Sequence, residues 1–296
     1  MTKLALLYEK LNNYERLMRL DRPIGILLLL WPTWWALWLS ARGLPDWRVW
    51  WIFTLGTVLM RSAGCVINDL ADRKFDPHVE RTRSRPLAAG TVSPREALGL
   101  FFVLVGCAVI VVLPVGSPLL AGLCVVALFL AASYPFTKRF LAVPQAYLGV
   151  AFGFGIPMAY AAQLDTLPTV CWWLLLANVF WAIAYDTEYA MVDRADDLKI
   201  GIRTSAITFG RFDVGMVMLC YALTLIILAL IGRHQGLGGW FYLSLLLAAA
   251  IAGYHYTLIR ERQPARCFTA FRHNNWFGAV IFVGIAVDYL FREYSR

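Results

Sequence analysis

The sequence predicts an all-α membrane protein that crosses the bilayer about nine times. Of its 296 residues, 60% are hydrophobic and 16% are charged, whereas a soluble domain carries about a quarter charged residues. The mean hydropathy is +0.61. The apolar residues occur in runs of about 20, which is the length that an α-helix needs to cross the hydrocarbon core. We therefore expect one polytopic domain over residues 1–296.

Nine apolar segments follow one another along the chain. Their expected bounds are 24–41, 48–67, 97–114, 118–136, 143–162, 168–186, 213–232, 237–258 and 275–291. Residues 1–22 are polar and mixed, with Leu4, Leu7, Leu11 and Met18 at helical spacing. This pattern favours an amphipathic leader helix on the membrane surface over a cleaved signal peptide.

The distribution of Lys and Arg predicts the orientation. Most of the 27 basic residues fall in the N-terminal segment and in the loops on that side of the predicted spans. The positive-inside rule then places the N-terminus in the cytoplasm and the C-terminus outside. Basic loops that orient membrane helices also account for the net charge of +8. We therefore expect the protein to interact with the lipid bilayer and not with nucleic acid. The six cysteines show no spacing typical of zinc or disulfides.

Two acidic clusters, at 68–76 and 186–197, each follow an apolar run on the predicted cytoplasmic side. Carboxylates at a membrane boundary are costly and indicate function. Spacings of four place side chains on one helix face, and two such faces together would offer hard oxygen ligands for Mg²⁺. The residues with this spacing are Asn68, Asp72, Asp76, Asp193 and Asp197. We expect them to converge on a central cavity that opens to the cytoplasm.

Other acids in these clusters differ in their expected positions. Asp69 and Asp196 fall off the main stripe, so they either support the ligands or face solvent. Asp186 and Glu188 lie one to two turns before Asp193. We expect that one of these two side chains can reach the cavity, whereas the other need not reach it.

Carboxylate-bound Mg²⁺ typically completes its ligand set with substrate phosphates, which points to a diphosphate. If the diphosphate carries an allylic isoprenoid, its departure generates an allylic cation, and a lipid tail explains the membrane location. Basic side chains would neutralise the leaving group and aromatic faces would stabilise the cation. The basic candidates are Arg22, Arg73, Lys74, Lys138 and Arg139.

Arg61 lies inside an apolar segment, seven residues before Asn68 and eleven before Asp72, so the three share a helix face. An Arg within an apolar helix is expected to face a cavity or an anion. We therefore expect Arg61 to hold an anionic acceptor or the diphosphate. The alternatives are snorkelling to the interface or pairing with a core acid.

At these residues the chain resembles the UbiA superfamily of intramembrane aromatic prenyltransferases. Asn68-Asp69-x-x-Asp72-x-x-x-Asp76 is similar to the first motif of that family, and Asp193-x-x-x-Asp197 to its second. Longer strings resemble the branch that acts on 4-hydroxybenzoate in ubiquinone biosynthesis. They are Asp21-Arg22-Pro23-Ile24-Gly25, Trp31-Pro32-Thr33-Trp34, 60–69, Arg83-Ser84-Arg85-Pro86-Leu87, Tyr134-Pro135-Phe136-Thr137-Lys138-Arg139 and 185–194.

The resemblance implies Mg²⁺-dependent transfer of a polyprenyl group from polyprenyl diphosphate to the ring carbon ortho to the hydroxyl of 4-hydroxybenzoate. It implies a multi-pass protein of the bacterial inner membrane with a cytoplasmic active site and no obligatory protein partner. The acceptor carboxylate is assigned first to Arg61 and second to Arg22. The implied catalytic residues are Asp72, Asp193, Arg61, Lys138 and Arg139. The implied substrate-binding residues are Arg22, Arg61, Arg73, Lys74, Tyr134, Lys138 and Arg139.

Three alternatives stay open at this point. A related enzyme would prenylate another acceptor, such as a naphthoate, homogentisate or haem. An ion-coupled transporter would also carry intramembrane acids, but transporters place them near the midplane, whereas both clusters here lie at one boundary. A purely structural scaffold has no need of these ligands.

Overall fold

The apolar segments of the chain form helices, as the sequence predicts. The computed structural model describes residues 3–74, 76–78, 82–137 and 139–294, and these ranges contain no strand. Nine helices within them are long and apolar enough to cross a membrane, which confirms the predicted number. Three of the nine are composite: Pro94–Val115 adds a 3₁₀ turn to an α-helix, Pro144–Leu164 joins α6 (Pro144–Gly153) to α7 (Gly155–Leu164), and Ser205–His234 joins α9 (Ser205–Phe209) through a 3₁₀ turn to α10 (Asp213–His234).

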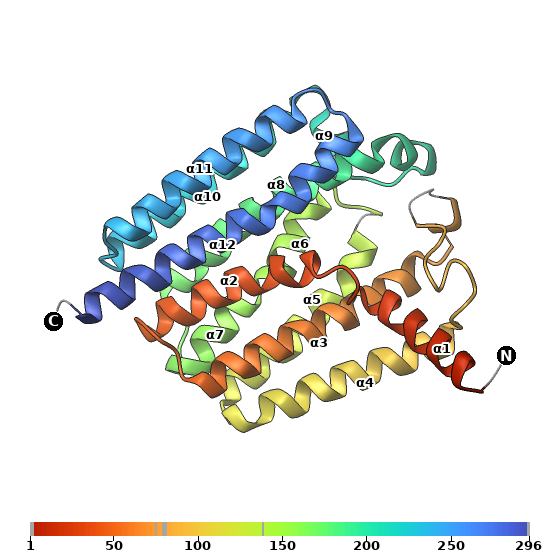
Figure 1. Ribbon diagram of the computed structural model, residues 1–296, viewed down its shortest axis with the longest axis horizontal. Helices are drawn as coiled ribbons and strands as arrows, with labels where there is room; N and C mark the ends of the chain where they lie inside the picture. Colours follow the sequence, from red (N-terminus) through yellow and green to blue (C-terminus); the bar gives the residue numbers. More distant parts are fainter. Residues whose placement is uncertain (1–2, 75, 79–81, 138, 295–296) are drawn as a thin grey trace.

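The main helices follow one another with short connections. They are α1 (Lys3–Met18), α2 (Ile24–Ala41), α3 (Trp47–Asp72), α4 (Pro94–Val112), α5 (Pro118–Thr137), α6 (Pro144–Gly153), α7 (Gly155–Leu164), α8 (Thr169–Ile200), α9 (Ser205–Phe209), α10 (Asp213–His234), α11 (Gly239–Ile259) and α12 (Pro264–Tyr294). Three single 3₁₀ turns occur at η1 (Asp76–His78), η2 (Leu113–Val115) and η3 (Gly210–Phe212). The N- and C-termini lie at opposite ends of the long axis (Figure 1), as an odd number of spans requires.

The helices that carry the acidic clusters are longer than predicted. Helix α3 continues to Asp72 where the apolar run suggests 67, and α8 continues to Ile200 where it suggests 186. Hydropathy marks where apolar side chains stop, but charged residues such as Arg, Lys and Glu are good helix formers. Both clusters therefore lie mainly on regular helix, although Asp76 lies beyond the end of α3 in η1.

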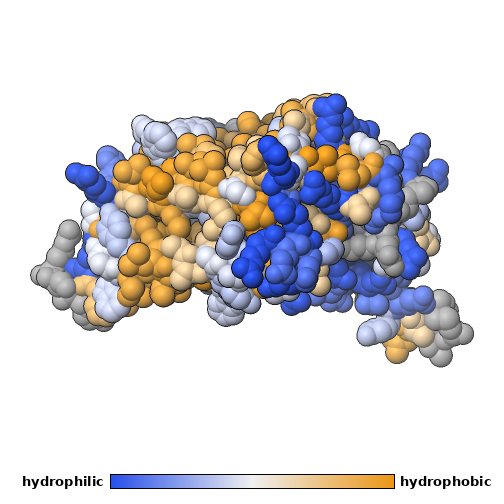
Figure 2. Space-filling model, turned by 90° about the horizontal axis from the view of Figure 1, so that it is seen from above, coloured by the Kyte–Doolittle hydropathy of each residue, from blue (hydrophilic) through white to orange (hydrophobic). Residues whose placement is uncertain are grey.

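Charge and hydropathy are separated along the molecule. Apolar side chains cover a broad band of the surface, and hydrophilic side chains are denser toward the end that holds the N-terminus (Figure 2). Leu4, Leu7 and Leu11 are exposed on α1. The leader is thus a helix with exposed apolar residues, and its attachment to the membrane surface stays a prediction.

Stacked aromatic rings join three of the central helices. Trp35 of α2 stacks on Trp181 of α8 with ring centroids 5.3 Å apart, and Trp181 stacks on Phe277 of α12 at 5.6 Å. All three side chains are fully buried. Such rings contribute a large buried area and fix the relative rotation of the helices.

A buried polar network joins α8 to α10 and α12. The Tyr221 hydroxyl donates to Glu188 Oε1 at 3.0 Å, and Asn274 Nδ2 donates to Glu188 Oε2 at 2.8 Å. Asn274 Oδ1 in turn accepts a hydrogen bond from Trp181 Nε1 at 2.9 Å. Of Asp186 and Glu188, therefore, Glu188 is the acid that turns into the core. Its hydrogen bonds satisfy a group that would be costly to leave unpaired inside a membrane protein.

Close contact between α6 and α8 depends on Gly149. A Cβ atom at this position would lie 2.8 Å from the Cα atom of Val179, and backbone cannot easily move away. Asn178 Nδ2 also donates to the Gly149 carbonyl oxygen at 3.0 Å across the same interface. Small residues allow helices to approach in this way within membranes.

We predict that Gly149→Ala destabilises the fold by about 1–3 kcal/mol because the added methyl group overpacks the interface. Thermal unfolding of the purified protein in detergent would show a lower midpoint. Gly122→Ala is the matched control, since a Cβ atom at Gly122 meets nothing within 4 Å. Equal midpoints for the two variants would contradict the close packing of α6 on α8.

Candidate active site

A cavity of about 490 Å³ lies at the end of the bundle where the two acidic clusters occur. Helices α2, α3, α5, α6, α8 and α12 all contribute to its walls. The lining includes all of the residues proposed from the sequence as metal ligands: Asn68, Asp72, Asp76, Asp193 and Asp197. Two patches more than 100 residues apart in the chain thus face one space.

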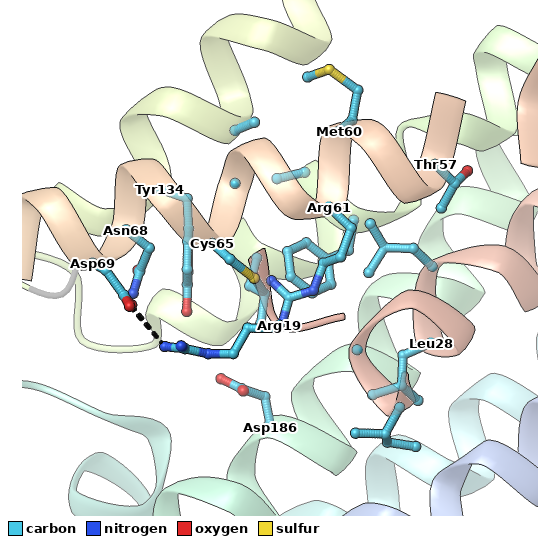
Figure 3. A pocket seen from close by; sticks show the side chains of 18 of the residues that line it. Arg19, Leu28, Thr57, Met60, Arg61, Cys65, Asn68, Asp69, Tyr134 and Asp186 are labelled. Carbon is cyan, nitrogen blue, oxygen red and sulfur yellow. Dashed lines mark hydrogen bonds and ion pairs between the residues drawn. The ribbon is translucent and has the colours of Figure 1, made fainter. Parts of the chain in front are cut away.

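Helical spacing arranges the polar lining in two tiers. Asn68 and Asp72 on α3, with Asp193 and Asp197 on α8, form what we term the outer tier. Arg61 on α3 and residues 185–186 on α8 form the inner tier, about 10 Å further along each helix axis. Figure 3 shows Arg61, Cys65 and Asn68 on one side of α3, with Asp186 approaching the same space from α8.

Asn68 presents an unused acceptor to the cavity. Its Oδ1 atom is buried and has no hydrogen-bond partner among the described residues. Buried acceptors almost always have a partner, so such an atom needs an explanation. An amide oxygen among carboxylates fits a hard cation such as Mg²⁺. No three His, Cys, Asp or Glu side chains in the described ranges lie close enough to hold a metal ion by themselves.

Arg61 is a cation without a counterion in the described part of the chain. Its Nε atom is buried and has no hydrogen-bond partner, and its guanidinium lies 5.3 Å from the centroid of the Phe152 ring. Gly25 makes room for it, since a Cβ atom there would lie 2.7 Å from Arg61 Nη2. Arg61 therefore faces the cavity, and the alternative of an ion pair with a core acid finds no support.

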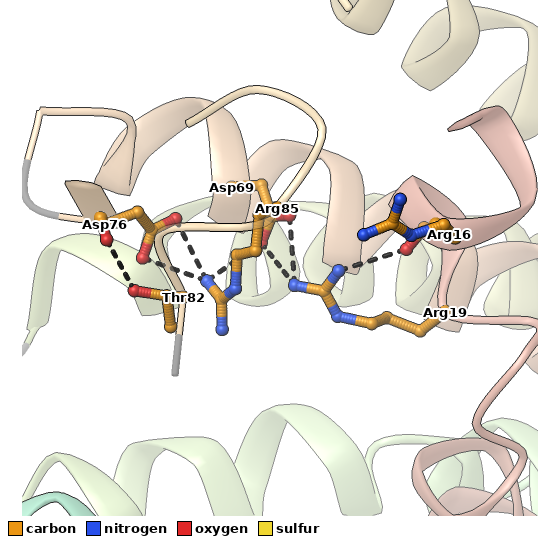
Figure 4. Close-up of polar contacts among 6 residues, drawn as sticks. All are labelled: Arg16, Arg19, Asp69, Asp76, Thr82 and Arg85. Carbon is orange, nitrogen blue, oxygen red and sulfur yellow. Dashed lines mark hydrogen bonds and ion pairs between the residues drawn. The ribbon is translucent and has the colours of Figure 1, made fainter. Parts of the chain in front are cut away.

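Asp69 lies at the centre of an ion-pair cluster with two arginines (Figure 4). Arg19 Nη2 contacts its two oxygens at 2.8 and 3.0 Å, and Arg85 Nη1 contacts Oδ1 at 3.1 Å. The Asp69 side chain is 1% exposed, so of the two alternatives expected for it, supporting the ligands or facing solvent, the structure excludes the second. Sequence reasoning assigned no role to Arg19 or Arg85. Arg85 lies in one of the strings that carry the family resemblance, whereas no pattern singles out Arg19.

Asp76 shares Arg85 with Asp69. Arg85 Nη1 contacts both oxygens of Asp76, at 3.0 and 3.1 Å, and the Asp76 side chain is buried. Burial raises the pKa of the Asp76 carboxyl, although the neighbouring Arg85 acts in the opposite direction. Asp76 therefore lines the cavity but is already engaged by a cation.

Asp196, by contrast, lies outside the lining and pairs with Lys199 at 3.1 Å.

The basic candidates from the sequence divide into two groups. Arg22 lines the cavity, with Asp21 at 3.5 Å from its Nε atom. Arg73 and Lys74 are exposed and outside the lining, because they lie in the turn that follows the last residue of α3. Arg139 is also exposed and outside the lining, with its guanidinium 5.2 Å from the Phe136 ring centroid. Lys138 lies outside the described residues.

Aromatic side chains line the cavity beside the charged residues. They are Tyr134, Phe152, Tyr185, Tyr189, Phe268 and Phe271. Tyr189 of α8 lies against Phe271 of α12 with ring centroids 4.6 Å apart. Tyr134 is half-buried, and its hydroxyl is within electrostatic range of Asp186, Asp72 and Arg61. Faces of this kind attract cations.

A second part of the cavity is apolar and reaches the helices at the edge of the bundle. Its walls come from α4 and α5, with Val105, Ala108, Val109, Val112, Cys124, Ala127, Leu128 and Ala131. Val109 is 48% exposed, so this wall continues onto the outer surface of the bundle. The cavity therefore joins a charged region to an apolar region.

Comparison with known proteins identifies the family of the chain. The model of the UbiA prenyltransferase family matches residues 29–278. The 4-hydroxybenzoate octaprenyltransferase of Dechloromonas aromatica is 67% identical over 284 residues, covering 96% of both chains. The protein of the same name from Thiobacillus denitrificans is 64% identical over 289 residues, covering 98% of both.

Solved structures share the fold. A UbiA homolog from Aeropyrum pernix K1 superposes with a TM-score of 0.78 at 23% identity, covering 89% of this chain and 97% of that one. A UbiA homolog from Archaeoglobus fulgidus, bound to GPP and Mg²⁺, has a TM-score of 0.67 at 19% identity, covering 93% and 99%. With a family match over most of its length and relatives of this identity, the chain belongs to the UbiA prenyltransferase family.

Proposed function

We propose that the protein transfers a polyprenyl group from polyprenyl diphosphate to the ring carbon ortho to the hydroxyl of 4-hydroxybenzoate. The products are 3-polyprenyl-4-hydroxybenzoate and diphosphate, and the pathway is ubiquinone biosynthesis. One observation carries the proposal: the two acidic clusters and the unpaired Arg61 line a single cavity that also has an apolar part. The names of relatives above 60% identity support it.

Mg²⁺ is the proposed cofactor, with Asn68, Asp72, Asp76, Asp193 and Asp197 as its ligands. The unused oxygen of Asn68 and the facing carboxylates fit a hard cation. Because the described residues form no closed site, diphosphate oxygens and water would complete the ligand set. When bound, Mg²⁺ neutralises diphosphate charge and so improves the leaving group. The Archaeoglobus fulgidus homolog bound to GPP and Mg²⁺ supports this assignment.

Basic residues at the cavity would bind the diphosphate beside the metal site, and Arg22 and Arg85 line that cavity. Lys138 and Arg139 stay candidates from their position in the sequence after Tyr134, although Arg139 lies outside the lining. Arg85 can exchange its contact with Asp76 for one with a diphosphate oxygen, and this exchange would release the carboxylate for the metal. Such preorganised cations stabilise charge that develops on the leaving group.

Arg61 would hold the carboxylate of the acceptor. Its buried, unpaired Nε atom is suited to an anion, and Phe152 supports the guanidinium from one face. The electron-rich ring of 4-hydroxybenzoate would then attack the allylic carbon, and loss of a ring proton restores aromaticity. The aromatic walls would stabilise the allylic cation and exclude water, which otherwise quenches it. The isoprenoid tail would occupy the apolar part between α4 and α5.

The proposed location is the bacterial inner membrane, with the N-terminus and the cavity on the cytoplasmic side. The excess of Lys and Arg in the segments at this end of the bundle supports that orientation.

A direct test is to incubate membranes containing the protein with Mg²⁺, labelled 4-hydroxybenzoate and prenyl diphosphates of several lengths. We expect a labelled lipid product that depends on the diphosphate and disappears with EDTA. Labelling of a naphthoate or homogentisate in place of 4-hydroxybenzoate would reassign the acceptor.

We predict that Asp72→Ala and Asp193→Ala each lower product formation by roughly 100- to 1,000-fold, because each removes charge that positions the diphosphate. Asp196→Ala is the matched control, since Asp196 lies in the same cluster but outside the lining. All three variants should insert and purify as the wild type does. Near-normal turnover of either cavity variant would contradict the proposed metal site.

We also predict that Arg61→Ala raises the KM for 4-hydroxybenzoate by roughly 10- to 100-fold, because a charge-assisted hydrogen bond is lost. The KM for the prenyl diphosphate should change little. Arg233→Ala, an exposed arginine in the last turn of α10, serves as control. An unchanged acceptor KM would move the carboxylate contact to another residue.

A further inference from the structure

Three buried polar atoms of the cavity lining have no hydrogen-bond partner among the described residues. They are Arg61 Nε, Asn68 Oδ1 and the hydroxyl oxygen of Tyr185. The proposed function assigns the first to the acceptor and the second to the metal. The Tyr185 hydroxyl has no role in either assignment.

The position of Tyr185 is held by aromatic contacts. Its ring meets Trp181 at 5.4 Å and Phe271 at 6.4 Å between centroids, and the residue is 1% exposed. These contacts fix the ring but offer the hydroxyl nothing to bind. A buried hydroxyl without a partner is destabilising, so a ligand that supplies the partner would recover that cost.

Tyr185 and Arg61 lie at the same depth of the cavity. Tyr185 is eight residues before Asp193 on α8, and Arg61 is seven before Asn68 on α3, so both lie about 10–12 Å inward from the outer tier. The hydroxyl is within electrostatic range of both the Asp186 carboxylate and the Arg61 guanidinium, and all three residues line the cavity. The inner tier therefore contains the Arg61 cation and the neutral Tyr185 hydroxyl, each with an unsatisfied atom, beside the Asp186 carboxylate.

The chemistry of the proposed reaction orients the acceptor between the tiers. The attacking carbon is adjacent to the carbon that bears the hydroxyl, and it must meet the allylic carbon near the diphosphate in the outer tier. The hydroxyl end of the ring then points outward and the carboxylate points inward. A buried carboxylate needs several hydrogen bonds. The Arg61 guanidinium, which lies against Phe152, leaves part of the hydrogen-bonding capacity of the carboxylate unfilled.

We infer that the Tyr185 hydroxyl donates a hydrogen bond to the acceptor carboxylate that Arg61 binds. Arg61 from α3 and Tyr185 from α8 then form a carboxylate subsite that selects 4-hydroxybenzoate over neutral phenols of the same size. The inference rests on the proposed function and adds a specificity-determining residue to it.

The test compares the binding of two phenols to the purified full-length protein by calorimetry in detergent. One is 4-hydroxybenzoate, and the other is 4-methylphenol, which lacks the carboxylate. Tyr185→Phe should weaken 4-hydroxybenzoate binding by roughly 10- to 100-fold and leave 4-methylphenol binding unchanged. Its thermal midpoint without ligand should stay equal or rise, because the deleted hydroxyl has no partner in the protein.

Tyr160→Phe is the matched control. Tyr160 has the same kind of buried, unpartnered hydroxyl but lies outside the cavity lining, so its removal should leave the binding of both phenols unchanged. The KM for 4-hydroxybenzoate in the prenylation assay should follow the binding result, with a smaller effect on kcat.

Other outcomes would overturn the inference. Unchanged affinity of Tyr185→Phe for 4-hydroxybenzoate, or an equal loss for both phenols, would show that the hydroxyl does not meet the carboxylate. A lower midpoint or failure to fold would show that it has a structural partner. If the wild-type protein itself fails to prefer 4-hydroxybenzoate over 4-methylphenol, the proposed function is wrong. If the wild type shows that preference and Tyr185→Phe keeps it in full, only the role of Tyr185 is misassigned.

Discussion

The fully buried carboxylate of Asp69 at the end of α3 needs cations, and this need organises the cavity end of the bundle. Arg19 reaches it from the end of α1 and Arg85 from the segment after η1. Removing one partner of such a pair costs about 3–5 kcal/mol because the remaining charge stays buried. The ion pairs therefore hold the leader helix and the following loop against α3, next to the outer tier.

The nine spans could be predicted from hydropathy because a bilayer requires runs of about 20 apolar residues. The helix ends could not, since apolar runs stop at the membrane boundary whereas α3 and α8 continue into polar sequence. The spacing of four placed Asn68 and Asp72 on one helix face, but the helix ends at Asp72, and a loop brings Asp76 to the same cavity. Helical spacing predicts which face a side chain occupies only for residues within the helix.

The basic residues show where sequence reasoning loses information. Arg73 and Lys74 follow Asp72 directly, yet they lie in the turn after α3 and outside the cavity lining, so nearness in sequence was a poor guide. Arg19 and Arg85 reach the site from 50 and 16 residues away from Asp69. Arg19 even adopts a left-handed backbone with φ of 58°, for which its residue type gives no signal. Contacts of this kind depend on tertiary packing, which no local pattern encodes.

Helix α8 separates two functions by face. Asp186, Asp193 and Asp197 share the cavity face, whereas Glu188 is rotated by about 200° from Asp186 and turns into the core. The hydrogen bonds of Glu188 to α10 and α12 fix the rotation of α8 about its axis. A rotation that moved Glu188 from its partners would also swing the outer-tier carboxylates away from α3. A change in the rotation of α8 would therefore affect the core network and the proposed metal site together, although they share no residue and lie on opposite faces of the helix.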